Sequence, residues 1–489
     1  MVLVFILILP LVGGAAIAAG RGRPGADRVA WVGVAANGTA LALGIWVAVR
    51  VVRSGPLTGA GGVLRADALS AFMVVVVSTI ALLASWVGVR TIALELAAGQ
   101  TSRARATTYA VLVQAFVAAM LLAVLAANVG VLWVAIEATT VVTTFLVGHR
   151  RTKGALEASW KYIVICSVGI ALAFLGTVLV YLAALHAGGH SAGALDWTSL
   201  MAHARRLNPA VLRLGFALVV LGYGTKVGLA PMHSWLPDAH SQAPAPISAL
   251  MSGVLLTVAF YAILRFKAVV DIALGPGFSR TLLVTVALLS LAVAASLLLT
   301  QRDYKRMLAY HSIEHMGLIA LGAAAGIPLA IAAVLLHILG HGLAKSVLFL
   351  TSGEIMAAEG TSQIDGVRTL LARRPALGGV FGIGLVALLG LPPFSLFSSE
   401  LLMARAEFEV GLGWAAVVAV VAMVVIFVAV VGHARHMLLG PSTTTEPLAP
   451  PPRWVAAPLV GGLVVCGLIG VFAWPLSGLL HAAAHVVTP

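Results

Sequence analysis

The sequence predicts an all-α integral membrane protein with about fourteen transmembrane helices, two of them interrupted by proline. Of its 489 residues, 61% are hydrophobic and only 10% are charged, and the mean hydropathy is +1.06. Soluble domains carry about 25% charged residues. Apolar runs of roughly 20 residues, the length that crosses a bilayer, follow one another along nearly the whole chain. These observations exclude a soluble globular protein.

Each predicted helix is an apolar run between two polar breaks. The division within 107–148 depends on Asn128 and Gly130, which alone mark a turn between two runs. The predicted helices cover residues 2–20, 29–49, 66–89, 107–127, 129–148, 158–185, 209–231, 244–264, 281–300, 307–325, 327–357, 377–404, 411–438 and 454–480.

The first apolar run ends in small residues, as a signal peptide does, but it lacks the basic residues that precede the apolar core of such peptides. We therefore predict that residues 2–20 form the first spanning helix. A cleaved signal peptide is the alternative for this segment.

Proline interrupts two of the predicted helices. The first carries Lys226 and then Pro231, and the second carries Pro392 and Pro393 before Glu400. Proline removes a backbone donor and opens the helix, which is tolerated at membrane depth only where protein or water satisfies the freed carbonyl groups. Each break therefore predicts a polar interior.

The spacing of these breaks predicts an internal repeat. Glu400 lies 174 residues after Lys226, and the helices that begin near 107 and 281 are separated by the same interval. Two five-helix units account for both intervals, and because five is odd the second unit runs inverted, as in transporters with discontinuous helices. The predicted organisation places helices 1–3 in residues 1–106, helices 4–8 in 107–268, helices 9–13 in 278–440 and helix 14 in 454–489.

The net charge of +13 does not indicate nucleic-acid binding, because the 30 Lys and Arg residues are scattered between apolar runs and form no basic face. Loops that follow odd-numbered helices carry more of them than the loops on the other side. The positive-inside rule then predicts that both termini lie outside the cytoplasm.

The two cysteines give no sign of a redox centre. Cys166 and Cys466 lie inside apolar runs, far apart in the sequence and without a CxxC pair. We therefore expect no metal and no iron–sulfur cluster in this chain.

Several ionisable residues fall within the predicted spans, where each charge costs at least about 2.5–3.5 kcal/mol to insert, and six of them are candidates for a proton path. A lysine in a poorly hydrated site sheds its proton when a neighbouring carboxylate moves away, so a movable pair of Lys226 and Glu137 is an elementary proton switch. A permanent buried ion pair is the alternative. The six residues, which we expect to form one polar line parallel to the membrane, are Glu137, Lys226, His337, His341, Lys345 and Glu400.

Three of these residues share one helical face. His337, His341 and Lys345 follow one another at intervals of four residues, a spacing suited to proton transfer along the helix. Two histidines four residues apart also occur in zinc sites, but the sequence shows no third ligand.

A candidate accessory path lies upstream. Lys305, His311 and Glu314 are its members, and His315 stands beside them at the start of the preceding helix. Contacts with solvent or lipid headgroups are the alternative for Lys305 and Arg306.

The chain contains the strings GTKVGLAPMHSWLPDAHSQAPAPISA, HILGHGLAKSVLFL and DYKRMLAYHS, and a glutamate after the second proline break. Together these motifs resemble the antiporter-like proton-translocating subunits shared by respiratory complex I, membrane-bound group 4 nickel–iron hydrogenases and Mrp-type cation/proton antiporters. The WLPDAHxxAP string is highly specific, and the resemblance covers about residues 60–440. Two segments, ALEASWKYIVICSVGIALAFLGTVLVYLA and AYHSIEHMG, are most similar to hydrogenase-4 component F.

The resemblance implies a fourteen-helix fold with inverted five-helix repeats. It also implies one role for each candidate residue along a proton path: Glu137 in helix 5, Lys226 in broken helix 7, His337, His341 and Lys345 as connecting residues in helix 11, and Glu400 as the terminal acid in broken helix 12.

The chain departs from the family pattern in helix 8. Many relatives carry a lysine or histidine there, whereas this chain has Ser252 or Thr257 at the matching position. A hydroxyl group holds no charge, so either water bridges Lys226 to the histidines or the path is altered.

The resemblance further implies a redox-driven complex in the inner membrane of a prokaryote. Other membrane subunits and a peripheral electron-transfer arm are its expected partners, and those partners carry iron–sulfur clusters and nickel–iron or flavin. This chain is then a non-catalytic, proton-pumping subunit of an oxidoreductase of the hydrogenase or NADH:quinone oxidoreductase type. Two alternatives stay open: a subunit of an Mrp-type Na⁺/H⁺ antiporter, and the membrane partner of a bicarbonate-uptake system.

Overall fold

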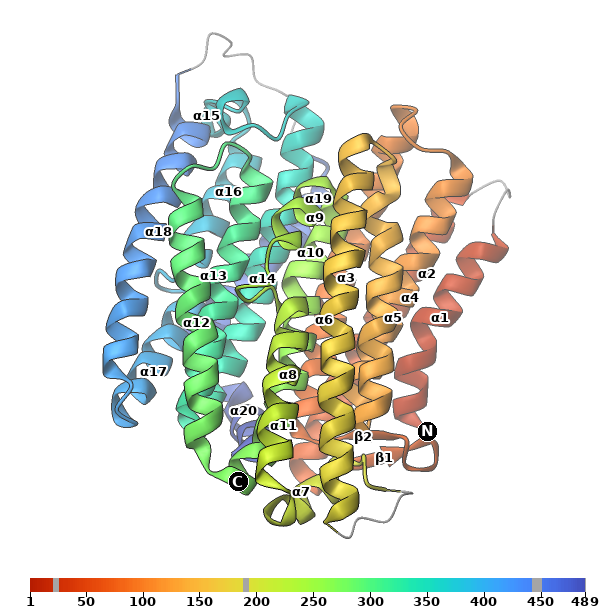
Figure 1. The fold of residues 1–489 in the computed structure, drawn as a ribbon. Coiled ribbons are helices and arrows are strands. Elements are labelled where there is room, and N and C mark those ends of the chain that lie inside the picture. Colours follow the sequence, from red (N-terminus) through yellow and green to blue (C-terminus); the bar gives the residue numbers. More distant parts are fainter. Residues whose placement is uncertain (21–25, 188–192, 442–450, 489) are drawn as a thin grey trace.

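Long helices run side by side along the whole bundle (Figure 1). The computed structural model describes residues 1–20, 26–187, 193–441 and 451–488. Among these residues, 12 helical segments are long and apolar enough to cross a membrane. The predicted all-α membrane fold is confirmed.

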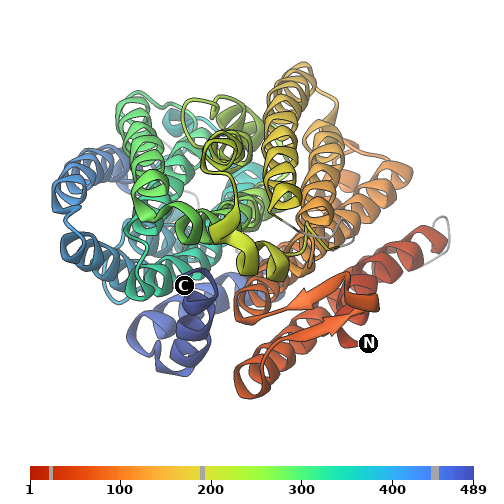
Figure 2. The same ribbon diagram turned by 60° about the horizontal axis from the view of Figure 1, so that its bottom comes forward.

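The N-terminal part of the bundle contains six long helices and one short pair of antiparallel strands, which lie beside the N-terminus (Figure 2). Asp67 caps the third helix by accepting a hydrogen bond from Ser70 N. The elements are α1 (Val2–Ala19), α2 (Ala26–Ser54), β1 (Leu57–Gly59), β2 (Leu64–Ala66), α3 (Ala68–Ala97), α4 (Arg103–Leu125), α5 (Val129–Val147) and α6 (Lys153–His186).

The predicted turn between the runs within 107–148 is confirmed. Asn128 caps α5, because its side chain accepts from Gly130 N at 2.8 Å and from Val131 N at 3.4 Å. The same side chain donates to Asp196 at 3.1 Å. This contact ties the turn to the start of a short helix, α7 (Trp197–His203).

The middle of the chain contains the first helix break. Helix α8 (Pro209–Val227) ends at Gly228, and the chain resumes as α9 (Trp235–Gln242). A continuous helical segment follows, made of α10 (Ala245–Leu250), a π-helical turn (Met251–Leu255) and α11 (Leu256–Leu274).

The C-terminal part contains the second break, between α16 and α17, where the sequence predicts it. Both breaks include a cis peptide bond before proline, at Ala230–Pro231 and Pro392–Pro393. The helices are α12 (Pro276–Leu298), α13 (Tyr304–Ala325), α14 (Pro328–Glu359), α15 (Leu370–Arg373), α16 (Pro375–Leu388), α17 (Ser395–Glu409), α18 (Gly413–Leu439), α19 (Arg453–Val471) and α20 (Trp474–Val487).

One predicted helix is wrong. The segment 454–480 forms two helices, α19 and α20, rather than one. Pro475 stands in the first turn of α20, a position that proline favours because the missing N–H group needs no partner there. The predicted spans 307–325 and 377–404 correspond to α13 and to α16 with α17, which are not among the 12 apolar segments. The number fourteen and the inverted repeats therefore stay predictions.

Helix α14 lies at the centre of the bundle, in contact with α3, α10, α13, α16, α17, α19 and α20 (Figure 1). The most apolar stretches of α14 and of the α10–α11 segment are entirely buried. By contrast, α18 and α19 expose many large apolar side chains, as expected for lipid-facing helices.

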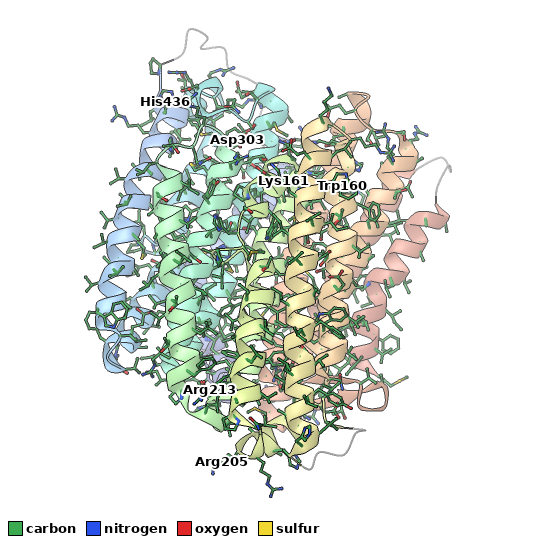
Figure 3. The ribbon with its side chains drawn as sticks, viewed as in Figure 1. Trp160, Lys161, Arg205, Arg213, Asp303 and His436 are labelled. Carbon is green, nitrogen blue, oxygen red and sulfur yellow. The ribbon has the colours of Figure 1, made fainter. Side chains whose placement is uncertain are left out.

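Charged side chains mark the two ends of the bundle. Arg205 and Arg213 lie at the end that carries both termini, and Asp303 and His436 lie at the other (Figures 1 and 3). We call these ends the terminal face and the opposite face. Helix α17 runs from mid-bundle toward the terminal face (Figure 1).

Candidate functional site: a buried polar line

The first break places Lys226 in the interior. Lys226 stands in the last turn of α8, and none of its surface is exposed. Its Nζ donates to the Tyr162 hydroxyl at 2.7 Å and to Thr140 Oγ1 at 3.1 Å, and it lies 4.9 Å from the centre of the Tyr162 ring. The ammonium group is thus held by hydroxyl groups and an aromatic face.

Small residues bring the Tyr162 helix close enough for this contact. Helices α6 and α8 pack tightly, and a Cβ on Gly222 would lie 2.4 Å from Ala173 N. A Cβ on Gly169 would lie 2.5 Å from the Cβ of Thr225, the neighbour of Lys226. Glycine at these positions permits the close backbone approach typical of membrane helices.

The break itself is held by polar contacts. Gly228 adopts φ +81°, a left-handed conformation that favours glycine. Trp235 Nε1 donates to the Thr225 carbonyl at 2.8 Å, and Ser290 Oγ accepts from Ala230 N at 2.9 Å. These bonds satisfy backbone groups that the interrupted helix leaves free, as the sequence predicts.

Glu137 lies in α5, one helical turn before Thr140, and is half-buried. Thr140 therefore stands between Glu137 and Lys226. Within the described residues, no carboxylate oxygen lies within 4.0 Å of Lys226 Nζ, so the predicted Glu–Lys pair is not in contact in this structure. One oxygen of Glu137, Oε2, is buried and has no hydrogen-bond partner among the residues that the structure describes.

Helix α9 contributes a histidine that the sequence analysis did not select. His240 is fully buried, and in the described part of the chain neither of its ring nitrogens has a hydrogen-bond partner. Its ring stacks on Phe349 of α14, with 5.0 Å between ring centres. Its position in the WLPDAH string is the signal that could have identified it.

Lys305 supports this short helix. It is fully buried at the start of α13, and its Nζ donates to the carbonyl groups of Ser241 at 3.0 Å and Ala243 at 2.7 Å. A cation is favourable at the C-terminal end of a helix, where carbonyl groups are free. Lys305 thus makes no solvent contact, whereas its neighbour Arg306 forms an ion pair with Asp238 at 2.5 Å and is partly exposed.

Hydroxyl groups occupy the region where relatives are expected to carry a charge. Ser252, in the π-helical turn, lies 2.8 Å from Ser312 of α13, oxygen to oxygen. Thr257 donates to the Val254 carbonyl at 3.0 Å. Both are fully buried.

The predicted face of α14 lies at the centre of the bundle. His337, His341 and Lys345 are all fully buried. Lys345 Nζ donates to the Leu308 carbonyl of α13, and both ring nitrogens of His341 lack a partner. The two histidine rings are stacked at 6.4 Å.

A second pair of histidines on α13 faces this helix. His315 Nδ1 lies 3.0 Å from His337 Nε2, and the His315 ring centre lies 5.0 Å from that of His341. His311 stacks on His315 at 4.8 Å, and its Nδ1 lies 2.7 Å from a carboxylate oxygen of Glu314. Four imidazoles therefore form one contiguous cluster. The sequence analysis named His315 beside His311 but did not predict its contact with His337.

The second break places Glu400 against this cluster. Ligand atoms of His315, His337 and Glu400 all lie within 4.8 Å of one another. His337 Nδ1 lies 3.0 Å from Ser399 Oγ. Gly390 has φ +63°, and a Cβ there would lie 2.1 Å from Glu400 Oε2, so this break has room for the acid only because residue 390 is glycine.

An acidic cavity of about 360 Å³ adjoins Glu400, between α13, α16, α17 and α18. Glu314, Glu400 and Glu407 line it, and its other lining residues are uncharged. Protons that reach Glu400 thus have a polar neighbour in a cavity that a water chain can fill.

The structure brings the predicted residues together in two groups. Lys226 and Glu137 lie around Thr140, and His337, His341 and Glu400 lie around His315. Lys345 and His240 both lie against Phe349, with Lys345 Nζ 6.0 Å and the His240 ring centre 5.0 Å from the centre of its ring. Neutral imidazoles pass protons between their two nitrogens, so the cluster is suited to proton transfer.

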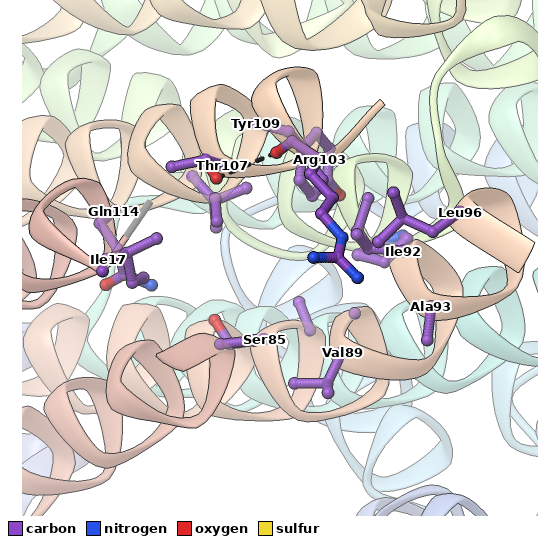
Figure 4. Close-up of a pocket in the computed structure, with 18 of the residues that line it drawn as sticks. Ile17, Ser85, Val89, Ile92, Ala93, Leu96, Arg103, Thr107, Tyr109 and Gln114 are labelled. Atoms are coloured by element: carbon purple, nitrogen blue, oxygen red, sulfur yellow. Dashed lines mark hydrogen bonds between the residues drawn. The ribbon is translucent and has the colours of Figure 1, made fainter. Parts of the chain in front are cut away.

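A smaller cavity of about 150 Å³ lies away from this line, among α1, α2, α3 and α4 (Figure 4). Arg103 points into it between apolar side chains such as Ile92 and Val89. It contains no carboxylate or histidine that would extend the polar line.

One buried ion pair lies at the terminal face. Arg265 Nη2 donates to Asp67 at 2.7 Å and to Ser70 Oγ at 2.9 Å. Burial alone would raise the pKa of Asp67, but the guanidinium beside it holds that pKa below its usual value. The pair fixes α11 to the start of α3.

Comparisons with known proteins agree with this arrangement. The family model described as "NADH:quinone oxidoreductase/Mrp antiporter, TM" matches residues 126–426, a range that contains both breaks and the whole polar line. The chain is 40% identical over 348 residues to a hydrogenase-4 component F homolog of Methylacidiphilum infernorum, a match that covers 71% of this chain and 73% of that protein. It is 32% identical over 381 residues to NADH-quinone oxidoreductase subunit N of Parafrankia sp., covering 75% and 70%.

Solved structures share the fold. A chain of the archaeal membrane-bound sulfane sulfur reductase superposes with a TM-score of 0.88 at 25% identity, covering 100% of this chain and 98% of that one. A chain of the Mrp complex from Dietzia sp. gives 0.84 at 22% identity, covering 99% and 96%, and a chain of complex I from Thermus thermophilus gives 0.82 at 22%, covering 100% and 99%.

Proposed function

Because this chain belongs to the NADH:quinone oxidoreductase/Mrp antiporter family of membrane proteins, we propose that its buried polar line moves protons in step with electron transfer in partner subunits. The chain is an antiporter-like membrane subunit of the superfamily that includes complex I, hydrogenase-4 and Mrp antiporters. The proposal concerns what drives the protons and which residues carry them.

The setting of Lys226 is the observation that supports the proposal most directly. A fully buried ammonium group without an ion-pair partner is costly, and evolution seldom places one in a membrane for packing alone. Tyr162 and Thr140 offset part of that cost without supplying a negative charge. The charge of Lys226 therefore depends on whether a carboxylate approaches.

Glu137 is the carboxylate placed to do so. It is half-buried, one of its oxygens has no hydrogen-bond partner, and Thr140 lies between it and the lysine. In the arrangement seen here, Thr140 lies between Glu137 and Lys226, and we take the lysine to be charged. When Glu137 moves toward Lys226, the ammonium form is stabilised further; when Glu137 moves away from Thr140, the lysine releases its proton.

The released proton travels toward α14 and leaves through the second break. We assign the transfer between the two groups to His240, which contacts Phe349, and to the Ser252–Ser312 pair, with Lys305 holding α9 in place. His341, His315 and His337 then connect Lys345 to Glu400 and its acidic cavity. Ser252 and Thr257 hold no charge, so water is the carrier in this region.

The driving reaction belongs to other subunits. We infer that they carry iron–sulfur clusters and nickel–iron or flavin, as implied by the similarity to a hydrogenase-4 component F homolog. The complex then lies in the inner membrane of a prokaryote, with both termini of this chain outside the cytoplasm. This chain supplies the proton path and no redox centre.

The test uses the native complex, purified gently, its partners identified, and reconstituted in vesicles with a pH-sensitive dye. We expect Lys226→Ala to lower redox-driven proton uptake more than about tenfold while electron transfer and assembly persist, because alanine carries no proton. Lys153→Ala, at an exposed lysine of α6, is the matched control and leaves uptake unchanged.

Normal pumping by Lys226→Ala would show that this lysine is structural. Proton uptake driven by a Na⁺ gradient, without any electron donor, would instead favour a Na⁺/H⁺ antiporter subunit. Co-purification of a soluble zinc protein in place of redox subunits would favour the membrane partner of a bicarbonate-uptake system.

A further inference from the structure

We propose that His315, His337 and Glu400 form a binding site for a divalent transition-metal ion such as Zn²⁺, which on binding locks the second helix break. The three side chains come from three helices, α13, α14 and α17, and their ligand atoms lie within 4.8 Å of one another. Two imidazoles and one carboxylate are the donor set of many zinc sites.

The two imidazoles are already close to ligand geometry. His315 Nδ1 and His337 Nε2 are 3.0 Å apart, and tetrahedral zinc places neighbouring ligand atoms roughly 3.3 Å apart. The Glu400 carboxylate has to move closer, and both rings have to turn so that the two nitrogens face the ion rather than each other. A water molecule from the adjoining cavity supplies the fourth position.

The hydrogen bond from His337 to Ser399 favours the tautomer of His337 that zinc requires. His337 Nδ1 lies 3.0 Å from Ser399 Oγ, so a proton on Nδ1 leaves Nε2 free to bind the ion. In the metal-free protein, His315 Nδ1 then donates to His337 Nε2, so zinc binding requires the His315 proton to move to Nε2. Ser399 thus fixes one ligand as outer-shell residues do in known metal sites.

The acidic cavity provides a way in. Glu314, Glu400 and Glu407 line its volume of about 360 Å³, and no Lys, Arg or His is among its lining residues. A cavity of one sign of charge raises the local concentration of the opposite ion. A hydrated cation therefore enters beside Glu400 and meets the two histidines behind it.

A second triad overlaps the first but is less suited. His311, Glu314 and His315 also lie within 4.8 Å of one another, yet all three belong to α13, and His311 Nδ1 already lies 2.7 Å from Glu314. An ion held by His315, His337 and Glu400 crosslinks three helices, which is why it would hold the break in one conformation.

The experiment measures binding of ⁶⁵Zn²⁺ to the purified complex by equilibrium dialysis. We expect the wild type to bind one zinc ion per chain more than His315→Gln or Glu400→Gln, or to bind that ion at least tenfold more tightly. His341→Gln is the matched control, because His341 lies one turn from His337 on the same helix but outside the triad; its zinc binding equals that of the wild type.

A third variant guards against misfolding. Glu400→His replaces one zinc ligand by another, so zinc binding persists in Glu400→His while Glu400→Gln loses it. Equal zinc binding by the wild type and Glu400→Gln overturns the proposal, as does loss of binding in His341→Gln.

The zinc test is independent of the proposed proton path. Lys226→Ala leaves the zinc site intact, so it binds zinc normally whether or not it pumps. If pumping does not depend on Lys226, the proposed proton path is wrong. If zinc binding does not depend on Glu400, the proposed zinc site is wrong, and each result can occur without the other.

Discussion

The two helix breaks share a backbone design but differ in their surroundings. Each has a glycine with positive φ, Gly228 or Gly390, and a proline in the opened segment. At the first break Lys226 is fully enclosed by hydroxyl and aromatic side chains. At the second, Glu400 is half-buried and borders an acidic cavity.

This difference assigns proton storage to the first break and proton release to the second. A charge that is sealed among neutral groups changes its protonation only when a counter-charge moves, whereas a carboxylate beside a cavity exchanges protons with water directly. One design of interrupted helix thus serves a closed site at one end of the polar line and an open site at the other.

The largest predicted effect tests the open site. Glu400→Gln keeps the size of the side chain but carries no proton, so we expect redox-driven proton uptake in vesicles to fall by more than about tenfold. Glu409→Gln, which alters an exposed acid of the same helix paired with Arg405, is the control and retains full uptake. Undiminished uptake by Glu400→Gln would mean that protons leave elsewhere.

Much of this comparison was predictable from the sequence. Proline in apolar runs identified both breaks, and the interval of four residues identified the face of α14. Contacts between helices were not predictable, because periodicity relates residues on one helix only. The sequence therefore named His315 beside His311 but gave no sign of its 3.0 Å contact with His337 across two helices. Lys305 was assigned to a path, but its bonds to two carbonyl groups of the α9 end give it a supporting role.

A second prediction compares the hydrogen bonds that hold each site. Tyr162→Phe removes the 2.7 Å partner of the Lys226 ammonium group, and Ser399→Ala removes the 3.0 Å partner of the His337 imidazole. Bonds to charged groups are worth about 1.5–3 kcal/mol and neutral ones about 0.5–1.5 kcal/mol. We expect the lower thermal unfolding temperature in Tyr162→Phe, measured on the purified complexes in detergent.

The outcome reports the charge of Lys226 in the resting protein. If both variants lose equal stability, Lys226 is held as a neutral amine. The hydrogen bond at the first break then does not differ in charge from the one at His337. Thr143→Ser is a control for packing changes, because it is a conservative change at a buried threonine of α5 close to Thr140 in sequence. We expect it to have little effect on the unfolding temperature.

The smallest predicted effect separates backbone strain from proton transfer. Gly228→Ala and Gly390→Ala both place a Cβ on a residue with positive φ, and each costs roughly 1 kcal/mol of stability. The new Cβ displaces an apolar atom at the first break, 2.3 Å from Leu236 Cδ1, but the acid itself at the second, 2.1 Å from Glu400 Oε2. We therefore expect similar losses of thermal stability but a loss of proton uptake, about twofold or more, in Gly390→Ala alone. Equal losses of uptake would show that both breaks act only as hinges, and that the position of the Glu400 carboxylate does not limit the rate.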